Sequence, residues 1–205
     1  MTKLKNVNEN YIHVCELTKI NIKNKAIALS KMNFTQPQML EIIDFFLFNA
    51  PVLKTNTKTN EFGLKSLKDY GWVGPSLGKL EGKLLNAANL SIFCFIKSDT
   101  IQETLKAMDL EDKICVEHPR AVLKQNVKVT LLEDGSTRIS QQETRMECLF
   151  RHLRNSLAHN LTYQFDNGNI LLEDQDDNNR ITARILIPKD ALLEWIKIIK
   201  QDNKH

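Results

Sequence analysis

The segment 141–159 has the most regular hydrophobic pattern in the chain, and it constrains the fold more than any other stretch. Met146, Phe150, Leu153 and Leu157 recur at spacings of three and four residues, so a helix over 141–159 aligns them along one side. The other side of this helix collects polar side chains, which are Arg151, His152, Asn155, Ser156 and His159. The pattern predicts a helix with one face in the core and a polar face outside it.

Arg154 lies at the border between the two faces, where its long side chain can extend toward either. Arg154 and His159 are five residues apart, so an ideal helix points them roughly 140° from each other. A single helix therefore does not direct both side chains at one atom. Two copies of the helix that cross in a symmetric pair bring one Arg154 and one His159 together.

Five further helices are expected from the same periodicity. Pro37 fits the first position of one of them, with Thr35 or Gln36 as its N-cap, and Pro51 ends it. The last helix has Asp190 in its first turn, where a carboxylate is favourable. The predicted ranges are 8–30, 37–48, 77–97 and 101–108, followed by the helix after Pro188.

Short strands are expected on both sides of the 141–159 helix. Residues 127–132 and 137–139 form a hairpin around Glu133-Asp134-Gly135-Ser136, and 163–165 pairs with 170–173 in a second hairpin. Residues 180–187 alternate and predict one more strand. Residues 114–123 are apolar but interrupted by His118-Pro119, and the pattern does not assign them to an element.

The predicted fold class is therefore mainly α. It is a helical bundle in one domain, 1–205, and the hairpins 127–139 and 163–187 are attached beside the 141–159 helix. The polar segment 51–62 is expected to be a flexible loop. The net charge of +3 gives no overall basicity, so a nucleic-acid site has to be a local patch.

Composition also suggests where the protein acts. No apolar run is long enough to span a bilayer and no signal peptide is recognisable, so a cytoplasmic protein that does not use a membrane is expected. The widely spaced Cys15, Cys94, Cys115 and Cys148 fit neither a metal site nor a small disulfide framework, and are expected to be free thiols.

Two ligand motifs are incomplete. Only three residues separate Gly74 from Gly78, and Leu80 stands where a phosphate-binding loop needs Ser or Thr. The stretch that begins at Asp174 has Asn179 in place of the glycine of a calcium loop, and Ile185 in place of its bidentate glutamate. We expect a packed turn and a solvated turn, with no metal and no cofactor.

The sequence Arg154-Asn155-Ser156-Leu157-Ala158-His159 resembles the signature of the HEPN superfamily (higher eukaryotes and prokaryotes nucleotide-binding domains). That signature is an arginine followed by a polar residue, a few further residues and a histidine, placed on a late helix. The sequence of these six residues is similar to that of bacterial and plasmid-borne members of defence and toxin type. The resemblance covers six residues and implies an up-down helical bundle.

The resemblance implies a metal-independent endoribonuclease. RNA provides the 2′-hydroxyl nucleophile, so the enzyme has to supply a group that titrates near neutral pH and a fixed cation. By resemblance His159 is the general acid or base and Arg154 stabilises the phosphate. Asn155 orients the phosphate or the imidazole. His152, Arg151 and Ser156 are supporting candidates. The products are then a 2′,3′-cyclic phosphate and a 5′-hydroxyl.

The implied partners are RNA and a second copy of the chain, with a cognate antitoxin or regulatory protein in a toxin or anti-phage system. A non-catalytic module that binds a nucleotide or a protein is the alternative within the same family. A third interpretation needs no substrate, because Arg151 and Arg154 can pair with Glu147 on neighbouring turns, and a histidine near a helix C-terminus is favoured by the helix dipole.

Overall fold

The centre of the protein is a five-stranded mixed β-sheet, seen in a computed structural model that describes residues 19–21, 27, 29–51, 65–97 and 100–200. The first pair of strands in the sheet is parallel and the other pairs are antiparallel. The strand order is β2 (Ile92–Ile96), β4 (Arg120–Lys124), β9 (Ile181–Pro188), β8 (Asn169–Gln175) and β7 (Thr162–Gln164).

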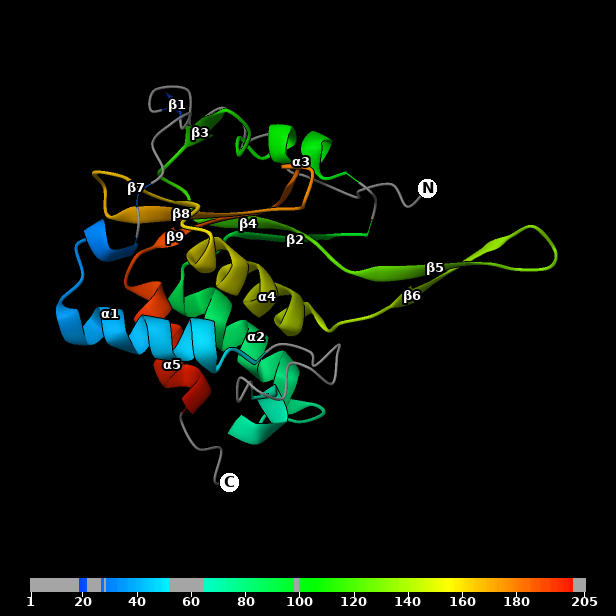
Figure 1. Ribbon diagram of the computed structural model, residues 1–205, viewed down its shortest axis with the longest axis horizontal. Coiled ribbons are helices and arrows are strands. Elements are labelled where there is room, and N and C mark those ends of the chain that lie inside the picture. Colours follow the sequence, from blue (N-terminus) through cyan, green and yellow to red (C-terminus); the bar gives the residue numbers. More distant parts are fainter. Residues whose placement is uncertain (1–18, 22–26, 28, 52–64, 98–99, 201–205) are drawn as a thin grey trace.

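The longer helices cover one face of this sheet, and smaller elements cover the other (Figure 1). On the helical face lie α1 (Gln36–Ile43), the π-helical turn η3 (Asp44–Phe48), η5 (Leu67–Tyr70), α2 (Ser76–Ala87), α4 (Arg145–Ala158) and α5 (Ala191–Lys200). The opposite face carries α3 (Gln102–Ala107) and the two-stranded pair of β1 (Lys19–Asn21) with β3 (Lys113–Cys115). A short 3-10 turn, η2, spans Leu29–Lys31.

Both faces of the sheet are buried, because successive side chains of a strand point to opposite sides. Ile170 and Leu172 of β8 belong to the core shared with the helices, whereas Leu171 belongs to the core under α3. Ala183 and Leu186 of β9 divide in the same way. The sheet therefore separates two apolar cores and is not a decoration on one.

The prediction of a mainly α bundle with attached hairpins is wrong, because the fold is mixed α/β. The strands within 163–187 pair with each other as predicted, but they also continue the sheet through β9 to β4. Strand β4 overlaps the segment 114–123, which the hydrophobic pattern did not assign to an element. Strands that are buried on both faces lose the alternation of apolar and polar residues that identifies a strand in a sequence.

The helix predicted over 77–97 ends ten residues early, at Ala87. Asn89 takes a left-handed φ of 49°, and the chain then enters strand β2. The apolar run Ile92–Ile96 fits a buried strand as well as a buried helix, and its length alone favours a strand. Most of the helix predicted over 8–30 lies outside the described residues, and the described part contains β1 and η2 instead.

Other predicted elements are confirmed. Helix α1 has Thr35 as its N-cap, with Pro37 in its first turn. Helix α3 and helix α5 are present. The packed turn after Gly74 leads into α2, and Trp72 beside it is buried with its indole Nε1 donating to the Ile199 carbonyl at 3.0 Å. Most of the expected loop, 52–62, also lies outside the described residues.

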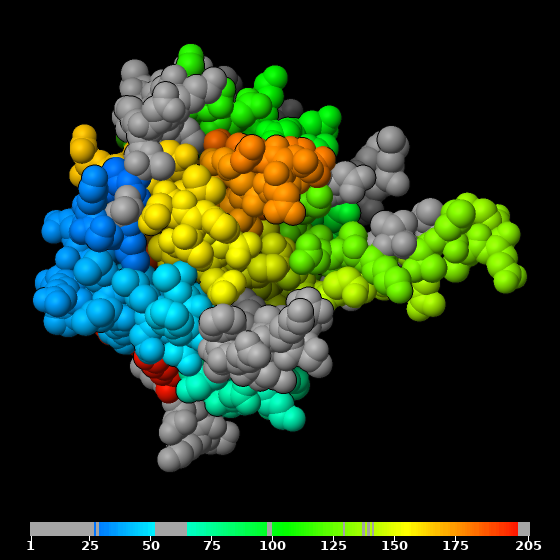
Figure 2. Space-filling view, in the orientation of Figure 1, coloured from blue at the N-terminus to red at the C-terminus, as the bar shows by residue number. Residues whose placement is uncertain are grey.

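The predicted hairpin of β5 (Val127–Leu131) and β6 (Thr137–Gln141) is confirmed, but it forms a separate two-stranded sheet. It extends away from the body of the molecule (Figures 1 and 2). The leucines at its turn are exposed, Leu131 by 72% and Leu132 by 41%.

Two further expectations were made from composition. Cys94 and Cys148 are free thiols as expected, whereas Cys115 is disulfide-bonded, which contradicts the expectation for that residue. Among the described helices, none has both the length and the apolar character needed to cross a bilayer.

Candidate functional site

Helix α4 carries the predicted site residues, and it begins later than the sequence suggested. Thr144 is its N-cap, so the helix starts at Arg145 and not at residue 141. The Thr144 amide donates to Glu147 Oε2 at 2.8 Å, and the Glu147 amide donates back to Thr144 Oγ1 at 3.2 Å, which is a capping box. Glu147 is therefore engaged at the helix start.

The end of α4 determines where His159 stands. Ala158 is the last helical residue, His159 is the C-cap, and Asn160 has a left-handed φ of 55°, which turns the chain out of the helix. The Leu161 amide donates to the Ser156 carbonyl at 2.9 Å and closes the end. The His159 side chain is exposed as a result.

Arg154 is half-buried on another side of α4, facing η3. Its Nε donates to the Leu47 carbonyl of η3 at 3.3 Å. Within the described part of the chain this is the one hydrogen bond of the Arg154 side chain. Arg154 and His159 thus lie in different environments of one protomer, as their five-residue separation predicts.

Arg151 and His152 form a buried polar network with residues that the sequence analysis did not select. The Arg151 Nε donates to Glu143 Oε2 at 2.9 Å and its Nη2 donates to Glu143 Oε1 at 2.7 Å. Such a two-point contact fixes both side chains. The His152 Nδ1 lies 2.6 Å from Asp174 Oδ2, and its Nε2 lies 2.8 Å from the Lys124 carbonyl.

Asn155 and Ser156 also point into this part of the structure. The Asn155 Nδ2 donates to Asp174 Oδ2 at 3.2 Å, so the motif asparagine is held by a carboxylate of β8. Ser156 is fully buried, and its Oγ donates to the His152 carbonyl one turn earlier. That hydroxyl serves the helix itself and does not reach a substrate.

His152 is completely buried and both of its ring nitrogens are engaged, so it positions other groups and does not contact a substrate. Burial lowers the pKa of His152, and the charge of Arg151 acts in the same direction against the opposing effect of Asp174. Burial raises the pKa of the nearby Cys148 thiol, so Cys148 is not a thiolate nucleophile.

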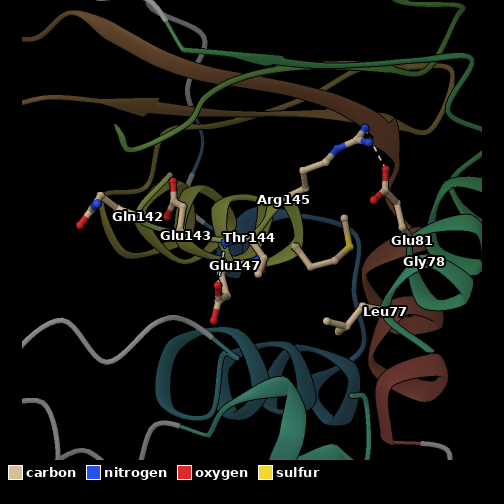
Figure 3. A pocket seen from close by; sticks show the side chains of 9 residues that line it. Leu77, Gly78, Glu81, Gln142, Glu143, Thr144, Arg145 and Glu147 are labelled. Atoms are coloured by element: carbon tan, nitrogen blue, oxygen red, sulfur yellow. Dashed lines mark hydrogen bonds and ion pairs between the residues drawn. The ribbon is translucent and has the colours of Figure 1, made fainter. Parts of the chain in front are cut away.

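Two cavities lie along α4. One of about 300 Å³ is lined by the polar side of α4 and by the end of β8, and it contains Arg151, His152, Asn155 and Asp174. In Figure 2 the yellow surface of the α4 region borders the orange surface of the segment after β8. The other cavity, of about 560 Å³, lies at the start of α4 beside α2, where Arg145 pairs with Glu81 at 2.8 Å (Figure 3). No motif residue from 154 to 159 lines that second cavity.

The sequence analysis missed Glu143 and Asp174, which complete the network. Asp174 was interpreted as the start of a solvated turn, and the turn is present, with the Arg180 Nε donating to Asp176 Oδ2 at 2.8 Å. Asp174 itself is the sixth residue of β8 and is only 2% exposed. The sequence did contain a signal for this position. Asp174 follows Ile170 and Leu172 at a spacing of two residues, which places it on the same face of the strand, toward α4. No group of three metal-ligating side chains occurs among the residues that the structure describes.

The pair of Arg151 and Glu143 makes a specific contribution to stability. Although burial opposes ionisation, the hydrogen bonds from Arg151 and from the Asn126 amide hold the pKa of Glu143 below its usual 4.5. A lowered folded-state pKa stabilises the fold above the unfolded pKa, and this stabilisation is lost as the pH falls through the folded value.

We therefore expect Glu143→Gln to lower the free energy of unfolding at pH 7. The difference in free energy of unfolding between the wild type and the variant should become smaller below pH 4.5, because the wild-type carboxylate is then protonated. Urea unfolding of both proteins at pH 7 and below pH 4 measures this difference. A cost that stays the same at both pH values would contradict the assignment. Glu147→Gln is the matched control, because it makes the same substitution in the capping box, where the carboxylate accepts from the Thr144 amide.

Comparison with known proteins adds no assignment, because no family model, no curated protein and no solved structure matches this chain.

Proposed function

We propose that the protein is a metal-independent endoribonuclease, in which His159 transfers protons and Arg154 stabilises the charge on the phosphate. The observation that carries the proposal is the way α4 divides its polar residues. His152 and Ser156 are used by the fold, whereas His159 is exposed at the end of the helix and the Arg154 guanidinium is held, among the described residues, through Nε alone. An exposed imidazole and an anchored cation are the two groups that cleavage by the 2′-hydroxyl requires.

The division between the two sides of α4 also suggests how the site is assembled. Since one protomer separates Arg154 from His159, the active unit is a symmetric dimer in which Arg154 of one copy faces His159 of the other. The resemblance of the motif to HEPN ribonucleases supports this arrangement. The mixed α/β fold differs from the bundle that the resemblance implied, so the proposal depends on the six motif residues and their placement. A role as a toxin or in anti-phage defence, controlled by an antitoxin, is part of the same proposal.

Incubation of the purified protein with total RNA in excess chelator tests the reaction type. We expect fragments that end in a 2′,3′-cyclic phosphate and begin with a 5′-hydroxyl, because the nucleophile comes from the RNA. The His159→Ala protein, purified in parallel, controls for a contaminating nuclease. Cleavage only in the presence of magnesium, or fragments with a 3′-hydroxyl, would overturn the proposed mechanism. A protein that binds RNA and never cleaves it would support the binding-module alternative.

A further inference from the structure

The hairpin of β5 and β6 forms an arm whose outer edges are open. Among the described strands, β5 and β6 pair only with each other, in a sheet apart from the central one. The arm extends away from the body of the molecule (Figures 1 and 2). An isolated two-stranded hairpin is marginally stable in water, and an open edge is a template for another strand. The arm therefore offers a place where a further strand can add.

The backbone of β6 presents a symmetric set of groups along its outer edge. The Gln142 amide donates to the Asn126 carbonyl at 3.1 Å, at the base of the arm. Residues that bond to the opposite strand alternate along an antiparallel pair with residues that do not. The even-numbered residues of β6 therefore bond to β5, and the backbone N–H and C=O groups that face outward are those of Thr137, Ile139 and Gln141.

A second copy of the arm is complementary to this edge. Rotation by 180° about the middle residue sets Ile139 opposite its own equivalent and Thr137 opposite the partner's Gln141. Each outward amide then meets an outward carbonyl, and the two arms form one four-stranded antiparallel sheet. Because the two β6 strands run in opposite directions, the turn of each arm lies beside the base of the other.

The turn and the base of the arm also fit each other. The turn carries the exposed side chains of Leu131 and Leu132. The base leads into the cavity of about 560 Å³ between α2 and α4, which is lined by Gln142, the residue after β6, and by the apolar side chains of Leu77 and Met146 (Figure 3). The partner's turn therefore arrives where this cavity opens, and two exposed leucines leave water there.

The charged groups that line this cavity are engaged within the same chain, so they do not exclude the leucines. Glu81 forms an ion pair with Arg145, Glu143 forms one with Arg151, and Glu147 accepts from the Thr144 amide. The turn brings the carboxylates of Glu133 and Asp134. Arg145 attracts them and Glu147 repels them, so these two effects oppose each other and the apolar contact decides.

The composition of the arm disfavours a nucleic acid as its partner. Residues 127–141 contain two basic and two acidic side chains, which are Lys128, Arg138, Glu133 and Asp134. Without net positive charge, the arm lacks the attraction for phosphates that supports nucleic-acid binding. The symmetric edge and the cavity at the base of the same arm indicate a second copy of this chain, because one molecule supplies both halves of the contact.

We propose that two copies of the chain associate through their arms, β6 against β6, and that Leu131 and Leu132 of each copy cover the cavity at the start of α4 in the other. Arg154 and His159 lie at the opposite end of α4. The contact between the arms is therefore separate from the pairing of those two residues, and it goes beyond the proposed function.

Sedimentation of the full-length protein at micromolar concentration tests the association. We expect the wild type to have about twice the mass of Leu131→Lys, because a charged side chain is unfavourable in an apolar cavity. Leu131 is exposed in the single chain, so this substitution leaves the fold intact. Leu40→Lys is the matched control at an exposed leucine of α1 and should keep the wild-type mass. A monomeric wild type, or equal masses of the wild type and Leu131→Lys, would overturn the inference.

A cysteine cross-link identifies the edge that pairs. In Ile139→Cys the two Cα atoms at the symmetry axis are roughly 5.5 Å apart, so a short bis-maleimide should join the chains. In Lys128→Cys, on β5, three strand spacings of about 14 Å in total separate the two copies, and the same reagent should not join them. The wild type controls for the native cysteines. Any other pattern contradicts the pairing through β6. Neither measurement involves RNA cleavage, so failure of this inference leaves the proposed function standing, and the reverse also holds.

Discussion

Substitution of His159 by alanine is expected to lower the rate of RNA cleavage by about 10²–10⁴-fold, which is the usual contribution of a general acid or base. The exposed position of His159 at the helix C-cap means that this loss is not accompanied by unfolding. Single-turnover cleavage of a labelled RNA, measured beside thermal unfolding of the same samples, checks both statements. His118→Ala is the matched control, because His118 is half-buried in the segment before β4, away from the motif.

The dimeric site predicts that two inactive variants rescue each other. A mixed dimer of Arg154→Ala and His159→Ala contains one intact pairing, with Arg154 from one chain and His159 from the other. After the two proteins are unfolded together and refolded, up to one quarter of the wild-type activity should return, since half of the dimers are mixed and each has one of its two sites. No recovery in a sample that sediments as a dimer would contradict the composite site.

Substitution of Glu173 by leucine is expected to destabilise the protein by about 3–5 kcal/mol, because it leaves a buried guanidinium without its counter-ion. Glu173 on β8 and Arg184 on β9 are neighbours in the register, and their side chains are 3% and 4% exposed. The Arg184 Nε and Nη2 reach Glu173 Oε2 at 2.7 and 2.6 Å. The Nη1 of Arg184 donates to the carbonyls of Leu110 and Glu111, and it thereby connects the sheet to the segment between α3 and β3.

Chemical denaturation measures this loss, and a double variant identifies its cause. The combination of Glu173→Leu with Arg184→Met should recover most of the stability lost in the single variant, because two apolar side chains then fill the site. Asp176→Asn removes a partner of Arg180 in an exposed pair and should destabilise the protein much less than Glu173→Leu does. A double variant that is as unstable as Glu173→Leu alone would show that the ion pair itself, and not the unpaired charge, is what matters.

The elements that could be predicted from the sequence are those with one exposed face or a defined end. Helix α4 shows its apolar stripe in the sequence, and the hairpin of β5 and β6 has a recognisable turn between alternating residues. Thr35 and Pro37 indicate the start of helix α1 in the sequence. Local chemistry is enough in these cases, because the caps and turns satisfy backbone groups within a few residues.

The central sheet could not be predicted in the same way. Strand β4 pairs with β9 across about sixty residues of chain, and its side chains are buried on both faces. The apolar part of β4 is only three residues long and does not distinguish a strand from part of a buried helix, and in β2 only the length of the apolar run favours a strand. Whether such a segment forms a strand depends on the strands with which it pairs, and these become adjacent only in the folded chain.

The sequence by itself placed Arg151, His152, Arg154, Asn155 and His159 on one helix and separated Arg154 from His159, because helical geometry depends on spacing alone. The tertiary structure decided which of these side chains are used by the fold. It brought Glu143 to Arg151 and Asp174 to His152 and Asn155, and it left His159 exposed. Burial and charge pairing between distant segments depend on the packing of the sheet against α4, and no local pattern in the sequence contains that information.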